Sequence, residues 1–388
     1  MSPYLQLIRQ KKFWVPVLIF LCFDLCLQTG IYRPYLKKGS FAANVVRNTE
    51  YILEKKPVFE PTILVLGTSV AYQGLSLETL NKALEPYGEK VQSLAMEGTE
   101  LVVQDSLIRN LLPKFPKVHT VLHILEISTP WVDQELLQIH TLAMLGELDR
   151  RIAFPIIFDF NYKVKYDDIG FLTFKSIAYR RDIRDFLLDP SKRLKDIGRR
   201  RKEPRLTPWP HENTNLPSIS MYPEVKDIAS CIKITNPNNG RPAPEGSDQF
   251  HKKAIWDTCD LARTNSKDIT RTKRALNYFH RLEILHGDIR RIGKENGHEI
   301  KIIGVIAPYS ELIKDWRNPE RNRIWQEEIQ KIHPDTVLLD YQDSLDGANN
   351  GDYYYDLIHL NKAGMHKFSD IFAADLPSIL GIGQKKAK

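Results

Sequence analysis

This chain has few cysteines, a small net charge and few long apolar runs. Its 388 residues include four cysteines, too few to build a disulfide scaffold. The 55 Lys and Arg residues exceed the 48 Asp and Glu residues slightly, for a net charge of +7, which suits nucleic acid, anionic lipid or an acidic polymer about equally well. A mean hydropathy of -0.35 excludes a protein with many membrane spans. The hydrophobic content of 42% excludes global disorder and supports a sizeable core.

The one strong apolar run covers residues 13–27, and only Pro16 and Asp24 interrupt it. A basic flank precedes the run and consists of Arg9, Lys11 and Lys12. Export machinery recognises such a flank followed by an apolar stretch. As a helix the run would be about 22 Å long, short of the ~30 Å hydrocarbon core, and residues 28–32 bring it to about the needed length. No A-x-A-like cleavage site follows. We therefore expect an uncleaved anchor, with a removed signal peptide and a buried amphipathic helix as the alternatives.

The charges around the run bear on its orientation and on the compartment. Basic residues before it favour a cytoplasmic N-terminus, although Arg33, Lys37 and Lys38 follow it. Most of the chain then lies outside the cytoplasm. There a disulfide between Cys231 and Cys259 is permitted, and two unpaired thiols are the alternative. No CxxC or HxxxH accompanies these cysteines, so we expect no metal site, and nothing in the sequence indicates a cofactor.

Short apolar runs alternate with amphipathic stretches on both sides of a central insertion. Strands are expected at residues 62–66, 90–95, 120–127, 299–307 and 336–340, and helices at 76–84, 100–112, 270–296, 319–332 and 361–376. Ser76, Asn318 and Asn361 stand where they can cap three of these helices. Strands that alternate with helices predict a parallel sheet covered on both faces.

This pattern predicts four parts. We expect a cytoplasmic flank and signal-anchor helix over 1–36, a stalk over 37–61, an α/β domain over 62–130 and 270–388, and an insertion over 131–269 that serves as a lid or docking region. The insertion is expected to be rich in loops, because residues 181–253 hold many prolines and few apolar runs. Its basic cluster, residues 199–202 with Arg205, either binds an anionic polymer or lipid headgroups or is a solvated face. Without a recognition motif we expect no nucleic-acid partner.

Two of the expected strands end in segments that can carry chemistry. In a parallel α/β sheet, ligands bind beyond the carboxyl ends of the strands. Ser69 ends the Gly-Thr-Ser turn after the first strand, and Gly98 follows the second strand. A serine on such a turn can expose its hydroxyl as a nucleophile, although the same turn can also cap a helix or hold a phosphate.

Asp356 and His359 stand three residues apart, just before the last helix. At this spacing in a loop, the carboxylate can accept a hydrogen bond from one ring nitrogen. The other nitrogen is then free to take a proton from a serine. The alternatives are a helix-capping aspartate with an exposed histidine, and a pair of metal ligands that lacks a third partner.

Together these segments resemble the SGNH/GDSL hydrolases. The resemblance covers residues 62–127 and 300–380, with the same order of expected strands and helices. Its specific part is the DLIHLNKAG segment at residues 356–364, whereas the Gly-Thr-Ser turn is degenerate. The resemblance implies an α/β fold of the flavodoxin-like type, a three-layer sandwich around a five-stranded parallel sheet.

The resemblance also implies a role for each candidate residue. Ser69 would be the nucleophile, His359 the general base and Asp356 the carboxylate that orients the base. The backbone N–H groups of Ser69 and Gly98 would form part of an oxyanion hole for the tetrahedral intermediate.

The sequence departs from the family in two places. Thr68 replaces the usual Asp of the Gly-Asp-Ser turn. After the third strand the family supplies an Asn, but residues 126–130 read Glu-Ile-Ser-Thr-Pro. One oxyanion donor is therefore missing or is replaced by Ser128 or Thr129, and losing such a donor typically lowers the rate by about 10²–10³-fold.

A single anchor with an exported SGNH-like domain is similar to proteins that modify envelope polymers, such as the alginate O-acetylation proteins and the D-alanyl-lipoteichoic acid protein. This similarity implies a single-pass protein of the bacterial inner membrane with its main domain on the periplasmic side. It would be a serine esterase or O-acyltransferase acting on an acylated envelope glycan or lipid, with a membrane-bound acyltransferase as a further partner. The alternative is a catalytically inactive SGNH-like module that binds an envelope polymer or a protein partner.

Overall fold

The chain folds into two units. Met1–Leu53 and Leu136–Leu206 form the helical unit, and Glu54–Glu135 and Thr207–Lys388 form the sheet unit. The computed structural model describes residues 10–37, 40, 42–43, 45–46, 49, 52–53, 56–57, 59–131, 143, 158–160, 165–200, 216, 218–220, 225–235, 252–260, 271–313, 318–347 and 350–382. The expected insertion is divided between the two units. Arg201, Lys202 and Arg205 of its basic cluster, and part of the expected stalk, lie outside the described residues.

The sheet unit is built on five strands that all run parallel, as the sequence predicts. They are β1 (Ile63–Leu66), β2 (Val91–Ser93), β3 (Thr120–Leu125), β4 (Lys301–Ile306) and β5 (Val337–Asp340). Their order is β2-β1-β3-β4-β5, the order of flavodoxin-like doubly wound folds. Every residue of β1, β2 and β3 is buried, which is typical of parallel strands covered on both faces.

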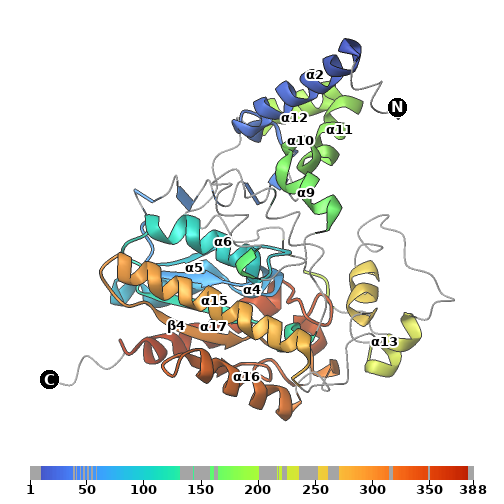
Figure 1. Ribbon diagram of the computed structural model, residues 1–388. Helices are drawn as coiled ribbons and strands as arrows, with labels where there is room; N and C mark the ends of the chain where they lie inside the picture. Colours follow the sequence, from blue (N-terminus) through green and yellow to red (C-terminus); the bar gives the residue numbers. More distant parts are fainter. Residues whose placement is uncertain are drawn as a thin grey trace. The chain divides into compact units, whose positions relative to one another are not determined.

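Helices lie between consecutive strands and after the last one. The long ones are α5 (Leu77–Leu84), α6 (Leu101–Leu111), α15 (Lys273–Glu295), α16 (Pro319–Ile332) and α17 (Lys362–Leu380), and shorter ones include α4 (Ser69–Gly74), α13 (Ile228–Ile234), η2 (Glu85–Tyr87), η3 (Leu112–Lys114), η4 (Thr129–Trp131) and η7 (Asn350–Tyr353). In one group α15 packs against α6 and α16, and in the other α17 packs against α5 and α4 (Figure 1). Ser76, Asn318 and Asn361 cap their helices as predicted.

The helical unit contains the N-terminal helix and the first half of the expected insertion. Its elements are α2 (Lys11–Gln28), η1 (Arg33–Tyr35), α9 (Tyr166–Thr173), α10 (Lys175–Ala178), α11 (Arg180–Leu188) and α12 (Pro190–Arg200). Figure 1 shows blue α2 beside the green helices, and α2 packs against α10. Among the helices in the described part of the chain, none combines the length and the apolarity needed to cross a membrane.

The insertion differs from the sequence-based expectation where the structure describes it. Residues 181–200 were expected among loops, but α11 and α12 occupy them. Both helices carry a narrow apolar stripe among many charges, so the average composition of the segment hid a helical period. The inward side chains of this stripe include Ile197, which is buried, and Ile183, which is partly buried, whereas Arg184 and Lys195 on the same helices are exposed.

Two buried histidines join β3 to α15. His123 Nδ1 lies 3.1 Å from His286 Nε2, and both rings are fully shielded from water. Burial lowers the pKa of His123 to about 3. Burial, followed by the charge that His123 would carry, also holds the pKa of His286 well below its usual value. Both rings are therefore neutral in the folded protein.

This pair predicts that stability falls in mild acid. Histidines of the unfolded chain take up protons below about pH 6.5, whereas the folded rings stay neutral. The stabilisation is fully present above that pH and is lost as the pH falls, by about 1.4 kcal/mol per pH unit for each ring. The unfolding free energy is measured by urea denaturation at a series of pH values from neutral to acidic. In His286→Gln its decrease per pH unit should be smaller than in the wild type by the contribution of one ring. Exposed His366→Gln is the control, and equal slopes for wild type and His286→Gln would refute the assignment.

Candidate active site

The strand order places the candidate residues at one edge of the sheet. From β1 the chain moves outward to β2 and then returns past β1 to form β3. In such sheets a crevice opens beyond the carboxyl ends of the two strands on either side of this reversal. Ser69 follows β1, Gly98 follows β2 and Ser128 follows β3. The topology therefore brings three separate turns to the same edge.

The turn after β1 has room only for glycine at its first position. Gly67 has φ +153°, and a Cβ there would lie 2.4 Å from Cβ of Ala71 and 3.0 Å from the carbonyl oxygen of Ile124. Thr68 is the N-cap of α4, and its Oγ1 accepts a hydrogen bond from the backbone N–H of Val70. Threonine can therefore fill the capping role of a first-turn aspartate. Ser69 becomes the first residue of the helix.

Ser69, His359 and Asp356 form a continuous hydrogen-bonded chain. Ser69 Oγ lies 2.8 Å from His359 Nε2, and His359 Nδ1 lies 2.8 Å from Asp356 Oδ2. With a carboxylate on Nδ1, that nitrogen carries the proton, and Nε2 is left to accept one from the serine hydroxyl. The structure thus brings together the three residues that the sequence singled out, across 290 positions of chain.

Asp356 is held in place by the backbone around it. It is 2% exposed, and its second oxygen, Oδ1, accepts hydrogen bonds from the backbone N–H groups of Ile358 (3.0 Å) and His359 (2.8 Å). Both oxygens are therefore engaged within a single tight loop. A carboxylate whose two oxygens both accept hydrogen bonds keeps a single orientation.

The loop that carries His359 is closed by a second set of backbone bonds. Tyr355 N donates to His359 O at 2.9 Å, and Asn361 N donates to Tyr353 O at 3.0 Å. Asn361 Oδ1 then caps α17 through the N–H of Gly364. A Cβ at Gly364 would lie 2.1 Å from Tyr353 O, so this glycine permits the close approach of helix and loop. The DLIHLNKAG segment is explained by this packing.

Opposing influences set the basicity of His359. Burial alone would lower the pKa of the ring, but the charge and the hydrogen bond of Asp356 raise it, and the charges of Glu126 and Glu97 add to the rise. The result is a pKa of about 8. The neutral ring predominates above about pH 8, where it can accept a proton and then give it back to a leaving group, which suits a general acid and base.

Sequence reasoning missed Glu126, the first residue after β3. Its side chain is buried, and Thr68 Oγ1 donates a hydrogen bond to Glu126 Oε1. Thr129 Oγ1 lies at 3.5 Å from Glu126 Oε2. Burial raises the pKa of Glu126, although the bonds from the two threonines and the charge of His359 oppose the rise. A carboxyl group directly after a buried central strand was the sequence signal that could have identified it.

The expected oxyanion donors are distributed around this edge. Gly98 has φ +67° and sits in the turn after β2. Ser128 and Thr129 are both buried. The hydroxyl of Thr129 is directed at Glu126, and Ser128 lies against Tyr309. Within the described residues, no group of three or more histidines, cysteines and carboxylates has the arrangement of a metal site.

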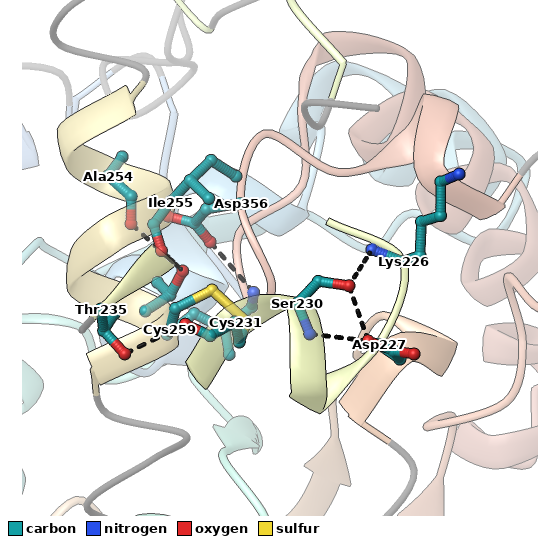
Figure 2. The surroundings of a disulfide bond; sticks show 11 residues. Lys226, Asp227, Ser230, Cys231, Thr235, Ala254, Ile255, Cys259 and Asp356 are labelled. Carbon is teal, nitrogen blue, oxygen red and sulfur yellow. Dashed lines mark hydrogen bonds between the residues drawn. A yellow bond between two sulfur atoms is a disulfide. The ribbon is translucent and has the colours of Figure 1, made fainter. Parts of the chain in front are cut away.

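A disulfide lies close to the triad carboxylate. Cys231 on α13 is joined to Cys259 in the helical residues 252–260, and both are buried. Figure 2 draws Asp356 among the residues around this disulfide. Nearby, Asn361 Nδ2 donates to Ile219 O at 3.4 Å. The second half of the expected insertion therefore packs against the loop that carries His359.

Removing this disulfide should weaken the folded sheet unit. It closes a loop of 28 residues, which corresponds to about 3.6 kcal/mol of stabilisation through the entropy of the unfolded chain. The double variant Cys231→Ser/Cys259→Ser should lose about that amount of unfolding free energy in urea denaturation. Cys22→Ser/Cys26→Ser, which removes two exposed free thiols, is the matched control. An unchanged midpoint for the first variant would contradict a stabilising disulfide.

Comparison with known proteins adds no assignment: no family model matches the chain, and no curated protein matches its sequence significantly. The function is therefore inferred from the geometry and the charges of this site.

Proposed function

We propose that the sheet unit is a serine esterase or O-acyltransferase domain of the SGNH/GDSL type. The chain of contacts from Ser69 Oγ through the His359 ring to Asp356, each at 2.8 Å, is the observation that carries this proposal. Its position at the carboxyl edge of a parallel sheet supports a site open to a ligand. The DLIHLNKAG segment, which resembles the corresponding SGNH segment, supports the choice of family.

The reaction follows from the three side chains. Ser69 Oγ attacks the carbonyl carbon of an ester while His359 Nε2 takes the hydroxyl proton, and the carbonyl electrons move to the oxygen. When the tetrahedral intermediate collapses, His359 returns the proton to the departing alcohol, which leaves an acyl group on Ser69. Water or a sugar hydroxyl then repeats the sequence, giving hydrolysis or acyl transfer. Asp356 stabilises the imidazolium that forms in each half.

The oxyanion of the intermediate needs hydrogen-bond donors. We assign the backbone N–H groups of Ser69 and Gly98 to this role, with Glu126 as a third donor. Glu126 Oε1 already accepts a bond from Thr68, so when Glu126 is protonated its proton belongs on Oε2. The contact of Oε2 with Thr129 is long, at 3.5 Å, which leaves this O–H available to a substrate oxygen. A neutral carboxylic acid in a buried site is a competent oxyanion donor.

Substitution of Glu126 tests this role. Glu126→Gln keeps a donor at the same position and should retain most of kcat near neutral pH. Glu126→Ala removes the donor and should lower kcat by about 10²–10³-fold. Burial raises the pKa of Glu126, so the protonated donor persists to a higher pH than in an exposed glutamate, and wild-type kcat should lose this contribution as the pH rises through the raised pKa. This loss should be absent in Glu126→Gln. If Glu126→Gln is as slow as Glu126→Ala, Glu126 is not a donor.

The substrate and location are part of the same proposal. The apolar run at residues 13–27 would hold the protein at the bacterial inner membrane, with the sheet unit on the periplasmic side. A disulfide between Cys231 and Cys259 supports an oxidising compartment. The acyl donor would then be an acylated envelope glycan or lipid, with a membrane-bound acyltransferase as a partner.

A panel of esters tests the proposed activity on the full-length protein. We expect release of acid from p-nitrophenyl esters and from an O-acetylated glycan, at rates that depend on acyl length. Transfer to an added glycan would distinguish an acyltransferase from an esterase. A folded protein that releases no acid from any ester would favour the alternative, an inactive module that binds an envelope polymer. The observation behind that alternative is the absence of an amide donor among residues 126–130.

A further inference from the structure

Large apolar side chains are exposed mainly on the helical unit. Among the described residues, only four large apolar side chains exposed to water belong to the sheet unit, namely Tyr87, Ile219, Leu276 and Val337. The others lie on α2, on α9 to α12, and in the segments beside them. Soluble proteins rarely leave so many large apolar side chains of one unit in water, so we take these helices to contact something else.

The N-terminal helix α2 turns apolar side chains outward and its acidic side chain inward, the reverse of a surface helix in a water-soluble protein. Its outward side chains are apolar, and they include Trp14, Leu18, Ile19, Phe23 and Leu25. Its acidic side chain, Asp24, is turned inward and is 5% exposed. A helix with apolar residues all round, and its charge turned inward, fits an apolar solvent.

The inward charge of α2 is satisfied by α10. Asp24 Oδ1 accepts hydrogen bonds at 2.7 Å from both N and Oγ of Ser176, and Asp24 Oδ2 accepts one from Gln28 Nε2. Phe20 also packs edge-on against Phe174. Polar contacts therefore tie α2 to a segment about 150 residues away, and the apolar faces remain outside.

The helices α11 and α12 repeat this arrangement. Asp182 and Arg193 form a buried ion pair at 2.9 Å. The hydroxyl of Tyr32 and the backbone N–H of Lys37 donate to the two oxygens of the same Asp182. These bonds fasten the chain that leaves α2 to both helices. On the outside, Leu187, Leu188 and Leu194 are 72%, 76% and 55% exposed.

Exposed cations surround these outward leucines. Arg180, Arg181, Arg184, Lys192 and Lys195 are all exposed, whereas Asp189 is the one exposed acid in the described part of α11, α12 and their junction, and Asp185, partly exposed, pairs with Lys37. Apolar side chains bordered by lysines and arginines suit a lipid interface, where the former reach the acyl region and the latter meet anionic headgroups.

We propose that α11 and α12 lie on an anionic lipid leaflet beside α2, so that the helical unit binds the membrane through two segments far apart in the sequence. This surface goes beyond an N-terminal anchor and does not depend on the serine chemistry. The buried pairs at Asp24 and Asp182 hold its parts together. A phosphatidylglycerol-containing bilayer is the occupant that matches both the leucines and the cations.

Site-specific fluorescence on the full chain tests the surface. An environment-sensitive label is attached at Leu188→Cys in a Cys22→Ser/Cys26→Ser background, which leaves the disulfide intact. In vesicles of phosphatidylglycerol and phosphatidylcholine, we expect a blue-shifted label that is quenched by lipid-borne nitroxide and protected from iodide. A label at exposed Glu283→Cys on α15 is the control and should show the reverse.

Charge and position variants complete the test. A label at Leu194→Cys should behave like the label at Leu188→Cys. In the Cys22→Ser/Cys26→Ser background, lipid-borne nitroxide should quench the label at Leu188→Cys more strongly in phosphatidylglycerol-containing vesicles than in vesicles of phosphatidylcholine alone. The added changes Arg180→Gln/Arg181→Gln/Arg184→Gln should abolish this difference and leave the circular dichroism spectrum unchanged. Labels at Leu188 and Leu194 that iodide quenches freely in vesicle-bound protein would overturn the proposal. Labels shielded from both quenchers would overturn it as well, because a protein would then cover this face.

Discussion

Ser69→Ala is expected to lower kcat for ester hydrolysis by about 10⁴–10⁶-fold, because the covalent route then has no nucleophile. The hydroxyl of Ser69 lies 2.8 Å from His359 Nε2, so its removal acts on the chemical step. KM should therefore change much less than kcat. The measurement is steady-state release of acid from the best ester of the panel, with protein concentration matched by absorbance.

Ser378→Ala is the matched control for this change. Ser378 is exposed on α17, near the carboxyl end of that helix, so its loss should leave both kcat and KM unaltered. Activity that survives in Ser69→Ala at a tenth of the wild-type rate or more would rule out a serine nucleophile. Circular dichroism of both variants separates a chemical effect from loss of the fold.

Asp356→Asn is expected to have the second largest effect, a loss of about 10⁴-fold in kcat, which is the loss known for the same change in a Ser-His-Asp triad. An amide can donate to His359 Nδ1, which would place the ring proton on Nε2 and leave that nitrogen unable to accept a proton from Ser69. Burial lowers the pKa of His359, and the charge of Asp356 is the main influence that raises it, to about 8. Asp356→Asn removes this charge. The ring then becomes a weaker base.

The dependence of kcat/KM on pH should shift in a defined direction in Asp356→Asn. His359 must be neutral to act as a base, so wild-type kcat/KM should rise with pH through about 8. Without the charge of Asp356 the pKa of the ring falls. The residual kcat/KM of Asp356→Asn should therefore still increase with pH, but this increase should occur at a lower pH than in the wild type. Asp352→Asn, an exposed acid four positions earlier, should keep the wild-type profile. An unshifted profile in Asp356→Asn would show that Asp356 does not set the basicity of His359.

Much of the sheet unit could be predicted because its signals are local. The apolar runs before Gly67 and after Pro116 are long enough to specify buried strands, and the capping residues Ser76, Asn318 and Asn361 mark helix starts. The close spacing of Asp356 and His359 was likewise visible in the sequence. Each of these features depends on residues a few positions apart.

The features that the sequence could not reveal depend on distant contacts. The position of Glu126 directly after a buried strand is a local signal, but its bond to Thr68 spans 58 positions, and no local pattern records that bond. The inward turn of Asp24 depends on Ser176, 152 positions away. Without this partner, Asp24 appeared only as an interruption in an apolar run. The charged helices α11 and α12 were likewise missed, because their inward charges pair across segments that are separate in the sequence.

Covalent labelling with a fluorophosphonate probe tests the central claim most directly. The probe reacts with a serine only when a neighbouring base has activated its hydroxyl. On the full-length protein we expect one adduct, which peptide mass spectrometry locates at Ser69. Labelling should be lost in Ser69→Ala and His359→Ala and retained in Ser378→Ala. A folded wild-type protein that takes up no probe, or one labelled equally in His359→Ala, would contradict the proposed serine hydrolase site.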